Sequence, residues 1–233
     1  MPSRNIIKTY IPNSFYHIYN RGVEKRVIFE DDQDHKVFLK YLKEYLSPPP
    51  DKTSLKKAFT LPLQGGSFKG VPRQPKNYYG EIELVAYCLM PNHFHLLLKQ
   101  KSDSSMEGFM RSLATRYSMY FNKRYDRVGK LFQGHYKAVF INDDNYLLHL
   151  SRYIHLNPKE INSDLLNAYS SYAEYLGKRN TTWLKPSFIL DYFNNSVTKD
   201  IKKFNSYNHF VENYSKDAPN SETFMGKLLI DNL

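Results

Sequence analysis

Hydrophobic and polar positions along the chain follow two different periods, and these periods predict the order of strands and helices. In the segment 93–99 apolar residues fall at every second position, which is the period of a strand. In the segment 37–45 they fall three and four apart, behind the acidic residues Asp31 and Asp32, which is typical of an amphipathic helix. Applied along the chain, the two periods predict strands at 15–20, 82–89, 93–99 and 131–141. They also predict a helix that Asp31 and Asp32 open and Pro48 ends, and helices at about 103–125 and 146–157.

The predicted order of elements is strand, helix, strand, strand, helix, strand, followed by one further helix. This order fits an α+β class, ferredoxin-like βαββαβ sandwich with an antiparallel sheet. Residues 47–80 interrupt it with six prolines, four glycines and six basic residues against one acidic residue, which predicts a basic loop or irregular hairpin inserted between core elements. We therefore expect a catalytic domain over 1–178 and a helical C-terminal appendage over 179–233.

Two histidines give the first candidate for chemistry. His93 and His95 are two apart in a predicted strand, so their imidazoles lie on the same face, a geometry suited to binding one divalent cation. Chance alone gives about 0.3 such pairs in a chain of this composition. Taken by itself, the pair fits the polar face of an ordinary strand at least as well as a metal site.

The second candidate lies on the last predicted core helix. Tyr153 and Asn157 are four residues apart and share one face of that helix, so a phenol and an amide oxygen can reach the same cleft. His149 shares this face as well. With 20 tyrosines in the chain, a packing role for Tyr153 is the simpler interpretation. Asn157 directly precedes Pro158, so ending the helix would be a sufficient role for it.

A third feature is the concentration of positive charge in the segment 111–137. It carries seven basic residues and one acidic residue, a net +6 out of the +10 of the whole chain. Aromatic residues are interleaved with the charges, a pattern that suits contact with phosphates and stacking on unpaired bases, although a solvated basic helix face would look the same. The basic residues that we expect to contact nucleic acid are Arg116, Lys123, Arg124, Arg127, Lys130 and Lys137, together with Arg21 after the first strand.

Composition narrows the class of protein further. The chain has 233 residues, 41% of them hydrophobic, which is enough for a sizeable core and argues against disorder over most of its length. Its one cysteine, Cys88, excludes an internal disulfide and a cysteine-rich zinc site, which favours a reducing compartment and a cytoplasmic location. No secretory leader and no membrane-spanning run of apolar residues is predicted.

Several ordered motifs together resemble a known family. They are Ala86-Tyr87-Cys88-Leu89-Met90-Pro91-Asn92-His93-Phe94-His95-Leu96-Leu97, Leu131-Phe132-Gln133-Gly134-His135-Tyr136-Lys137 and Arg152-Tyr153-Ile154-His155-Leu156-Asn157-Pro158. The chain resembles the single-tyrosine HUH transposases, and within them the REP-associated tyrosine transposases. The resemblance covers about residues 10–180.

The resemblance implies a specific chemistry. Tyr153 would be the nucleophile that forms a 5′-phosphotyrosine intermediate on single-stranded DNA, with a hairpin guiding cleavage. His93, His95 and Asn157 would hold Mg²⁺ or Mn²⁺, with His149 or water as rivals for the third position. The active form would be a monomer or a homodimer.

Two other functions stay open at this stage. The same fold and basic surface would serve a non-catalytic, domesticated protein that binds hairpin DNA or RNA. A metal hydrolase that activates water ranks lower, because no acidic residue lies in the strand of the histidine pair.

Overall fold

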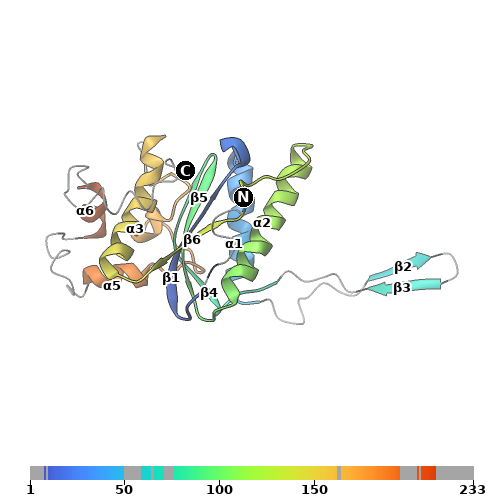
Figure 1. Cartoon of the computed structure of the whole chain (residues 1–233), viewed down its shortest axis with the longest axis horizontal. Helices are drawn as coiled ribbons and strands as arrows, with labels where there is room; N and C mark the ends of the chain where they lie inside the picture. The colour runs from blue at the N-terminus through green and yellow to red at the C-terminus, as the bar shows by residue number, and fades with distance from the viewer. Residues whose placement is uncertain are drawn as a thin grey trace.

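The computed structural model describes residues 8, 10–49, 59–63, 66–70, 76–161, 164–194, 204 and 206–213. A four-stranded antiparallel sheet forms its centre, in the order β4-β5-β1-β6 (Figure 1). The strands are β1 (Ser14–Arg21), β4 (Ile82–Met90), β5 (His93–Gln100) and β6 (Lys137–Ile141). β4 and β5 form a hairpin, whereas β1 lies between β5 and β6, which both come much later in the chain, as the ferredoxin-like order requires. The α+β sandwich expected from the sequence is therefore confirmed.

One face of the sheet is covered by α1 (Asp32–Leu46) and α2 (Ser105–Arg124) (Figure 1). The Asp31 side chain begins α1 by accepting hydrogen bonds from the backbone N–H groups of Gln33 and Asp34. The first core cluster lies between these helices and the sheet, and it takes Phe94, Leu96 and Leu98 from β5. This alternation puts His93 and His95 on the opposite face, as the sequence predicts.

The opposite face is covered by α3 (Asp144–Leu156), whose first turn is capped by the Asp143 carboxylate. The helix ends at Leu156, before Pro158, and a short 3-10 turn, η3 (Asn157–Glu160), follows it directly. The helices α4 (Tyr172–Tyr175), α5 (Ser187–Asn194) and α6 (Tyr207–Glu212) contribute to a second core cluster with α3 and the sheet. Figure 1 shows α3, α5 and α6 together on this side.

One predicted element differs from the structure. The strand expected at 131–141 is ordered as a strand only over Lys137–Ile141, because Leu131, Phe132 and Tyr136 turn into the first core cluster and Gly134 adopts a positive φ of 73°. The insertion contains a hairpin of β2 (Phe59–Leu63) and β3 (Gly66–Gly70), which extends away from the sheet in Figure 1. The rest of the insertion and much of the segment 195–233 lie outside the described residues.

None of the helices in the described part of the chain is both long and apolar enough to span a membrane.

Candidate active site on the α3 face of the sheet

The register of the sheet gathers polar side chains on the face that α3 covers. Tyr19 in β1 pairs with His95 in β5, and Arg21 pairs with His93. Residues two apart share a face, so His17 joins this group as a diagonal neighbour of His95. Two adjacent strands thus bring three histidines, a tyrosine and an arginine to one region.

His17 and His95 are hydrogen-bonded to each other at the centre of this region. Nε2 of His17 lies 2.8 Å from Nδ1 of His95, and both side chains are fully buried. Burial lowers the pKa of His17 to about 3 and holds the pKa of His95 well below its usual value, with His17 and His93 adding to the effect at His95. Both imidazoles are therefore neutral at pH 7. Nε2 of His95 and Nδ1 of His17 are buried without a hydrogen-bond partner among the described residues.

Tyr153 projects from α3 onto this pair. Its ring is half-buried and meets the His95 ring edge-on, with 5.4 Å between centroids, and the His17 ring at 6.5 Å. The structure thus brings together His17, His95 and Tyr153, which are 58 to 136 positions apart in the sequence. His93 lies beside them, with 5.1 Å between its ring centroid and that of His95. Of the predicted chemistry-bearing residues, the histidine pair and the tyrosine share one site.

The third predicted ligand is placed less directly. Asn157 lies at the junction of α3 and η3, and its Nδ2 donates to the Tyr153 carbonyl at 2.9 Å, which leaves Oδ1 as its acceptor. The rival His149 contacts Arg152, with 2.6 Å between Nδ1 and Nη2, and packs on Phe210 of α6. No group of three or more His, Cys, Asp or Glu side chains in the described chain is arranged to hold a metal ion.

The donors that are present fit a hard cation that keeps part of its water. Nε2 of His95 is buried and unpartnered, which is the condition of a nitrogen that can accept a metal. Two imidazoles and an amide oxygen would leave the other coordination positions to water and phosphate oxygens, an arrangement that Mg²⁺ tolerates and Mn²⁺ accepts readily.

The neighbours of Tyr153 on α3 contact other parts of the fold. Arg152 donates to the Phe210 carbonyl and stacks on the Phe210 ring. His155 bridges Tyr207 and Ser171, at 2.7 Å on each ring nitrogen. These partners of the two side chains belong to α6 and to the residue before α4.

Two of the predicted DNA-contacting residues flank the histidines. Arg21 lies opposite His93. Its carbonyl accepts a hydrogen bond from the Gln133 N–H and its side chain donates to the Gln133 side chain, in the segment before β6. Lys137 pairs with Tyr19 on the other side and shares its face. The sharp turn after Arg21 needs glycine, because a Cβ on Gly22 would lie 2.2 Å from the Arg26 carbonyl oxygen.

The basic segment itself is less exposed than its sequence suggests. Arg124 forms ion pairs with Asp31 at 2.6 Å and with the fully buried Asp34 at 2.7 Å, and Arg116 pairs with Glu44 at 2.6 Å. Carboxylates in α1 and at its N-cap thus neutralise part of the net charge of +6 that the segment 111–137 carries. Lys123 and Lys130 are exposed, and Arg127 is half-buried against Asn122.

The expected stacking surface is wrong for most of the aromatic residues in this segment. The core takes up four of them, since Tyr117, Phe121, Phe132 and Tyr136 are buried in the first cluster. Tyr120 and Tyr125 are only partly buried, but their hydroxyls donate to Asp34. The aromatic periodicity of α2 reflects packing against the sheet and α1.

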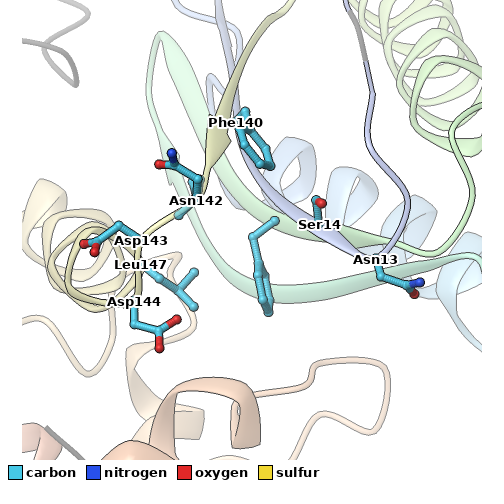
Figure 2. A pocket seen from close by; sticks show the side chains of 9 residues that line it. Asn13, Ser14, Phe140, Asn142, Asp143, Asp144 and Leu147 are labelled. Atoms are coloured by element: carbon cyan, nitrogen blue, oxygen red, sulfur yellow. The ribbon is translucent and has the colours of Figure 1, made fainter.

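A surface hollow lies away from these residues, between the start of β1, the end of β6 and the first turn of α3 (Figure 2). Asp143 and Asp144 line it together with Asn13, Ser14 and Asn142. Two carboxylates make it a poor receptor for a phosphate backbone, and it contains no histidine.

His17 is the site residue that the sequence does not single out. Its strand is predicted, and alternation there separates His17 and Tyr19 from Tyr16 and Ile18, but nothing local says which other strand lies alongside. Only the β1–β5 register brings it to His95.

Comparisons with known proteins agree with this picture. Residues 74–157 match the family model described as "Transposase IS200 like", which confirms the family resemblance for the segment that holds the histidine pair and Tyr153. No curated protein is similar enough in sequence to count as a match.

Among solved structures, a REP-associated tyrosine transposase bound to a REP hairpin aligns with a TM-score of 0.50 and 11% identity, over 76% of this chain and 87% of that one. A putative transposase from Deinococcus radiodurans R1 aligns with a TM-score of 0.36 and 15% identity, over 66% of this chain and 95% of that one. The first of these shows that the two proteins share a fold.

Proposed function

Taking residues 74–157 as an IS200-like transposase domain, we propose that this protein is a metal-dependent endonuclease and strand transferase acting on single-stranded DNA next to hairpins. The observation that carries the proposal is the packing of the Tyr153 ring on His95, whose outer nitrogen has no partner in the described structure. A nucleophile needs to lie next to the group that activates the phosphate, and here the Tyr153 phenol lies beside an imidazole whose Nε2 has no hydrogen-bond partner in the described structure. The hairpin in the structure of the REP-associated relative supports the choice of substrate.

In the proposed reaction the Tyr153 oxygen attacks a phosphodiester phosphorus. A bond forms between the phenolic oxygen and phosphorus, the bond to the 3′ oxygen breaks, and the 3′ oxygen leaves with a proton as a free hydroxyl. The phenol suits a reversible step because its reference pKa near 10 makes it a better leaving group than an alkoxide. A 3′-hydroxyl can then attack the phosphotyrosine and rejoin the strand without ATP.

His93, His95 and Asn157 are the residues that would hold Mg²⁺ or Mn²⁺. When bound, such a cation polarises a phosphoryl oxygen and stabilises charge on the leaving oxygen. The neutral state of His95, which burial enforces, keeps a lone pair available at neutral pH. Asn157 lies one helical turn beyond Tyr153, and its amide donates to the Tyr153 carbonyl, so the end of α3 would hold both side chains.

Arg21 and Lys137 would bind the DNA backbone closest to Tyr153, since they flank the histidines in the sheet. Lys123, Arg127 and Lys130 would extend this contact at the end of α2. Arg116 and Arg124 are better explained as structural residues, because carboxylates of α1 neutralise them. Binding carried by five cationic contacts should weaken steeply as salt rises.

A second candidate is a protein that binds hairpin DNA or RNA without cleaving it. One observation favours it: no group of three or more His, Cys, Asp or Glu side chains among the described residues is arranged to hold a metal ion. The two candidates differ in a covalent product, which makes them separable.

The test is to incubate the protein with Mn²⁺ and a labelled single-stranded oligonucleotide carrying a hairpin, then search for a covalent adduct on a denaturing gel. We expect an adduct that disappears with chelator and with Tyr153→Phe, and that persists with Tyr79→Phe, a control at an exposed tyrosine. Cleavage that survives Tyr153→Phe would remove Tyr153 as nucleophile. Hairpin binding with no adduct on any oligonucleotide would establish the binding protein instead.

Mixing two inactive variants tests the assembly of the site. Tyr153 and His95 of one chain already meet in the structure. We therefore expect Tyr153→Phe and His95→Ala to stay inactive when mixed, whereas restored adduct formation would point to a dimer that exchanges α3.

A further inference from the structure

The hydrogen bond between His17 and His95 determines where the two rings lie and also which of their nitrogens carry a proton. Both rings are nearly coplanar, with 14° between their planes, and each uses one nitrogen in the bond and buries the other without a partner in the described structure. Around His17 lie the rings of Tyr19 and Tyr153, with 4.9 Å and 6.5 Å between ring centroids.

A single proton lies between two neutral imidazoles, and its position sets the chemistry of the site. If Nδ1–H of His95 donates to Nε2 of His17, then Nε2 of His95 carries a lone pair. If Nε2–H of His17 donates instead, Nε2 of His95 carries a proton and cannot bind a cation. Either arrangement leaves one buried nitrogen of each ring unsatisfied in the described structure, which is unfavourable.

Only the first arrangement lets a bound cation satisfy one of those two nitrogens. We propose that His17 is a positioning residue that accepts the Nδ1–H of His95 and so holds the Nε2 lone pair of His95 ready for Mg²⁺ or Mn²⁺. The proposal rests on the metal role given to His95 in the proposed function. It also explains why β1 carries a buried histidine at a position where an apolar side chain would pack without an unsatisfied nitrogen.

Two substitutions separate positioning from packing. His17→Gln keeps an acceptor near the position of Nε2, and His17→Leu removes the acceptor while it keeps apolar volume. His209→Gln, at an exposed position of α6, is the matched control. Circular dichroism and the melting temperature establish that each variant is folded.

The first readout is the affinity for Mn²⁺ alone, measured by electron paramagnetic resonance without DNA. Loss of a hydrogen-bond partner behind a metal-ligating histidine weakens metal binding about 10- to 100-fold, so we expect this loss for His17→Leu and recovery of most of it in His17→Gln. The second readout is the tautomer of His95 from nitrogen chemical shifts of the ¹⁵N-labelled wild-type protein, with and without Mg²⁺, where we expect the Nδ1–H form.

The outcomes separate this inference from the proposed function. Wild-type Mn²⁺ affinity in folded His17→Leu, or a His95 ring protonated at Nε2 in the presence of Mg²⁺, would overturn the role of His17 and leave the function intact. A wild-type protein that binds no Mn²⁺ would overturn both.

Discussion

The hydrogen-bond chain that joins α6 to the tyrosine-bearing helix offers a sharp test of how this structure is held. The Tyr207 hydroxyl donates to Ser151 Oγ at 3.0 Å and bonds to Nδ1 of His155 at 2.7 Å, while Nε2 of His155 bonds to Ser171 Oγ at 2.7 Å. Tyr207, His155, Ser151 and Ser171 are all buried. The C-terminal helix is thereby tied to α3 in the two turns that carry Tyr153.

Tyr207→Phe keeps the ring and removes only the hydroxyl. It deletes two hydrogen bonds of about 1 kcal/mol each and leaves a ring nitrogen of His155 unsatisfied in a dry environment, so we expect a loss of about 2–4 kcal/mol in the free energy of unfolding. Against a total of about 5–15 kcal/mol for a typical protein, this is a large fraction.

Urea unfolding at equilibrium, followed by circular dichroism, measures this loss as a lower midpoint with an unchanged slope. Tyr79→Phe is the matched control, because Tyr79 is 52% exposed. A change below about 0.5 kcal/mol for Tyr207→Phe, within the range of ordinary surface substitutions, would refute the assignment of α6 as a support of α3.

Three further predictions concern other parts of the molecule. Burial lowers the pKa of His155 to about 3, so between pH 6.5 and 3 this group is protonated in the unfolded chain and neutral in the folded chain. The free energy of unfolding should therefore fall below pH 6.5 by about 1.4 kcal/mol per pH unit for this group. Urea titrations at several pH values should show a smaller dependence on pH in His155→Gln, and an unchanged dependence would contradict the prediction. Arg124→Ala should lower the melting temperature, because it leaves Asp34 buried without its cation. Lys123→Ala should leave the melting temperature unchanged and reduce the salt dependence of DNA binding by about one counterion. The reverse pattern would exchange the roles of the two residues. Asn157→Ala should raise the Mn²⁺ concentration needed for adduct formation, and an unchanged requirement would move the third ligand to water or His149.

The local pattern of the sequence predicted most of the secondary structure. Period two in β5 correctly assigned Phe94, Leu96 and Leu98 to the core and the two histidines to the other face, because side-chain direction in a strand depends only on alternation. Helix caps at Asp31 and Asp143 are local as well, since a cap needs only the next three residues. The strand expected at 131–136 failed because tertiary packing of Leu131, Phe132 and Tyr136 overrode its local alternation.

The charge pattern shows where sequence reasoning stops. The excess of +6 along 111–137 is a property of the chain, but its electrostatic effect depends on which carboxylates lie across from it in space. Asp31, Asp34 and Glu44 come from a helix about 70 to 90 positions earlier, and no local signal couples them to Arg116 and Arg124. The same limit applies to the aromatic residues of α2, whose period is the same for core packing and for base stacking.

The sequence by itself determined most of the elements and the faces of their strands and helices, because these depend on residue type and on spacings of two to four positions. The candidate nucleophile and histidine pair came from the resemblance of several ordered motifs to a known family. Only the tertiary structure decided that Tyr153 packs on His95, that Arg21 and Lys137 flank them, and that His17 stands behind His95. The reason is physical: strand register is set by the packing of whole faces, so the neighbours of a side chain across the sheet are fixed by the global fold and not by its own segment.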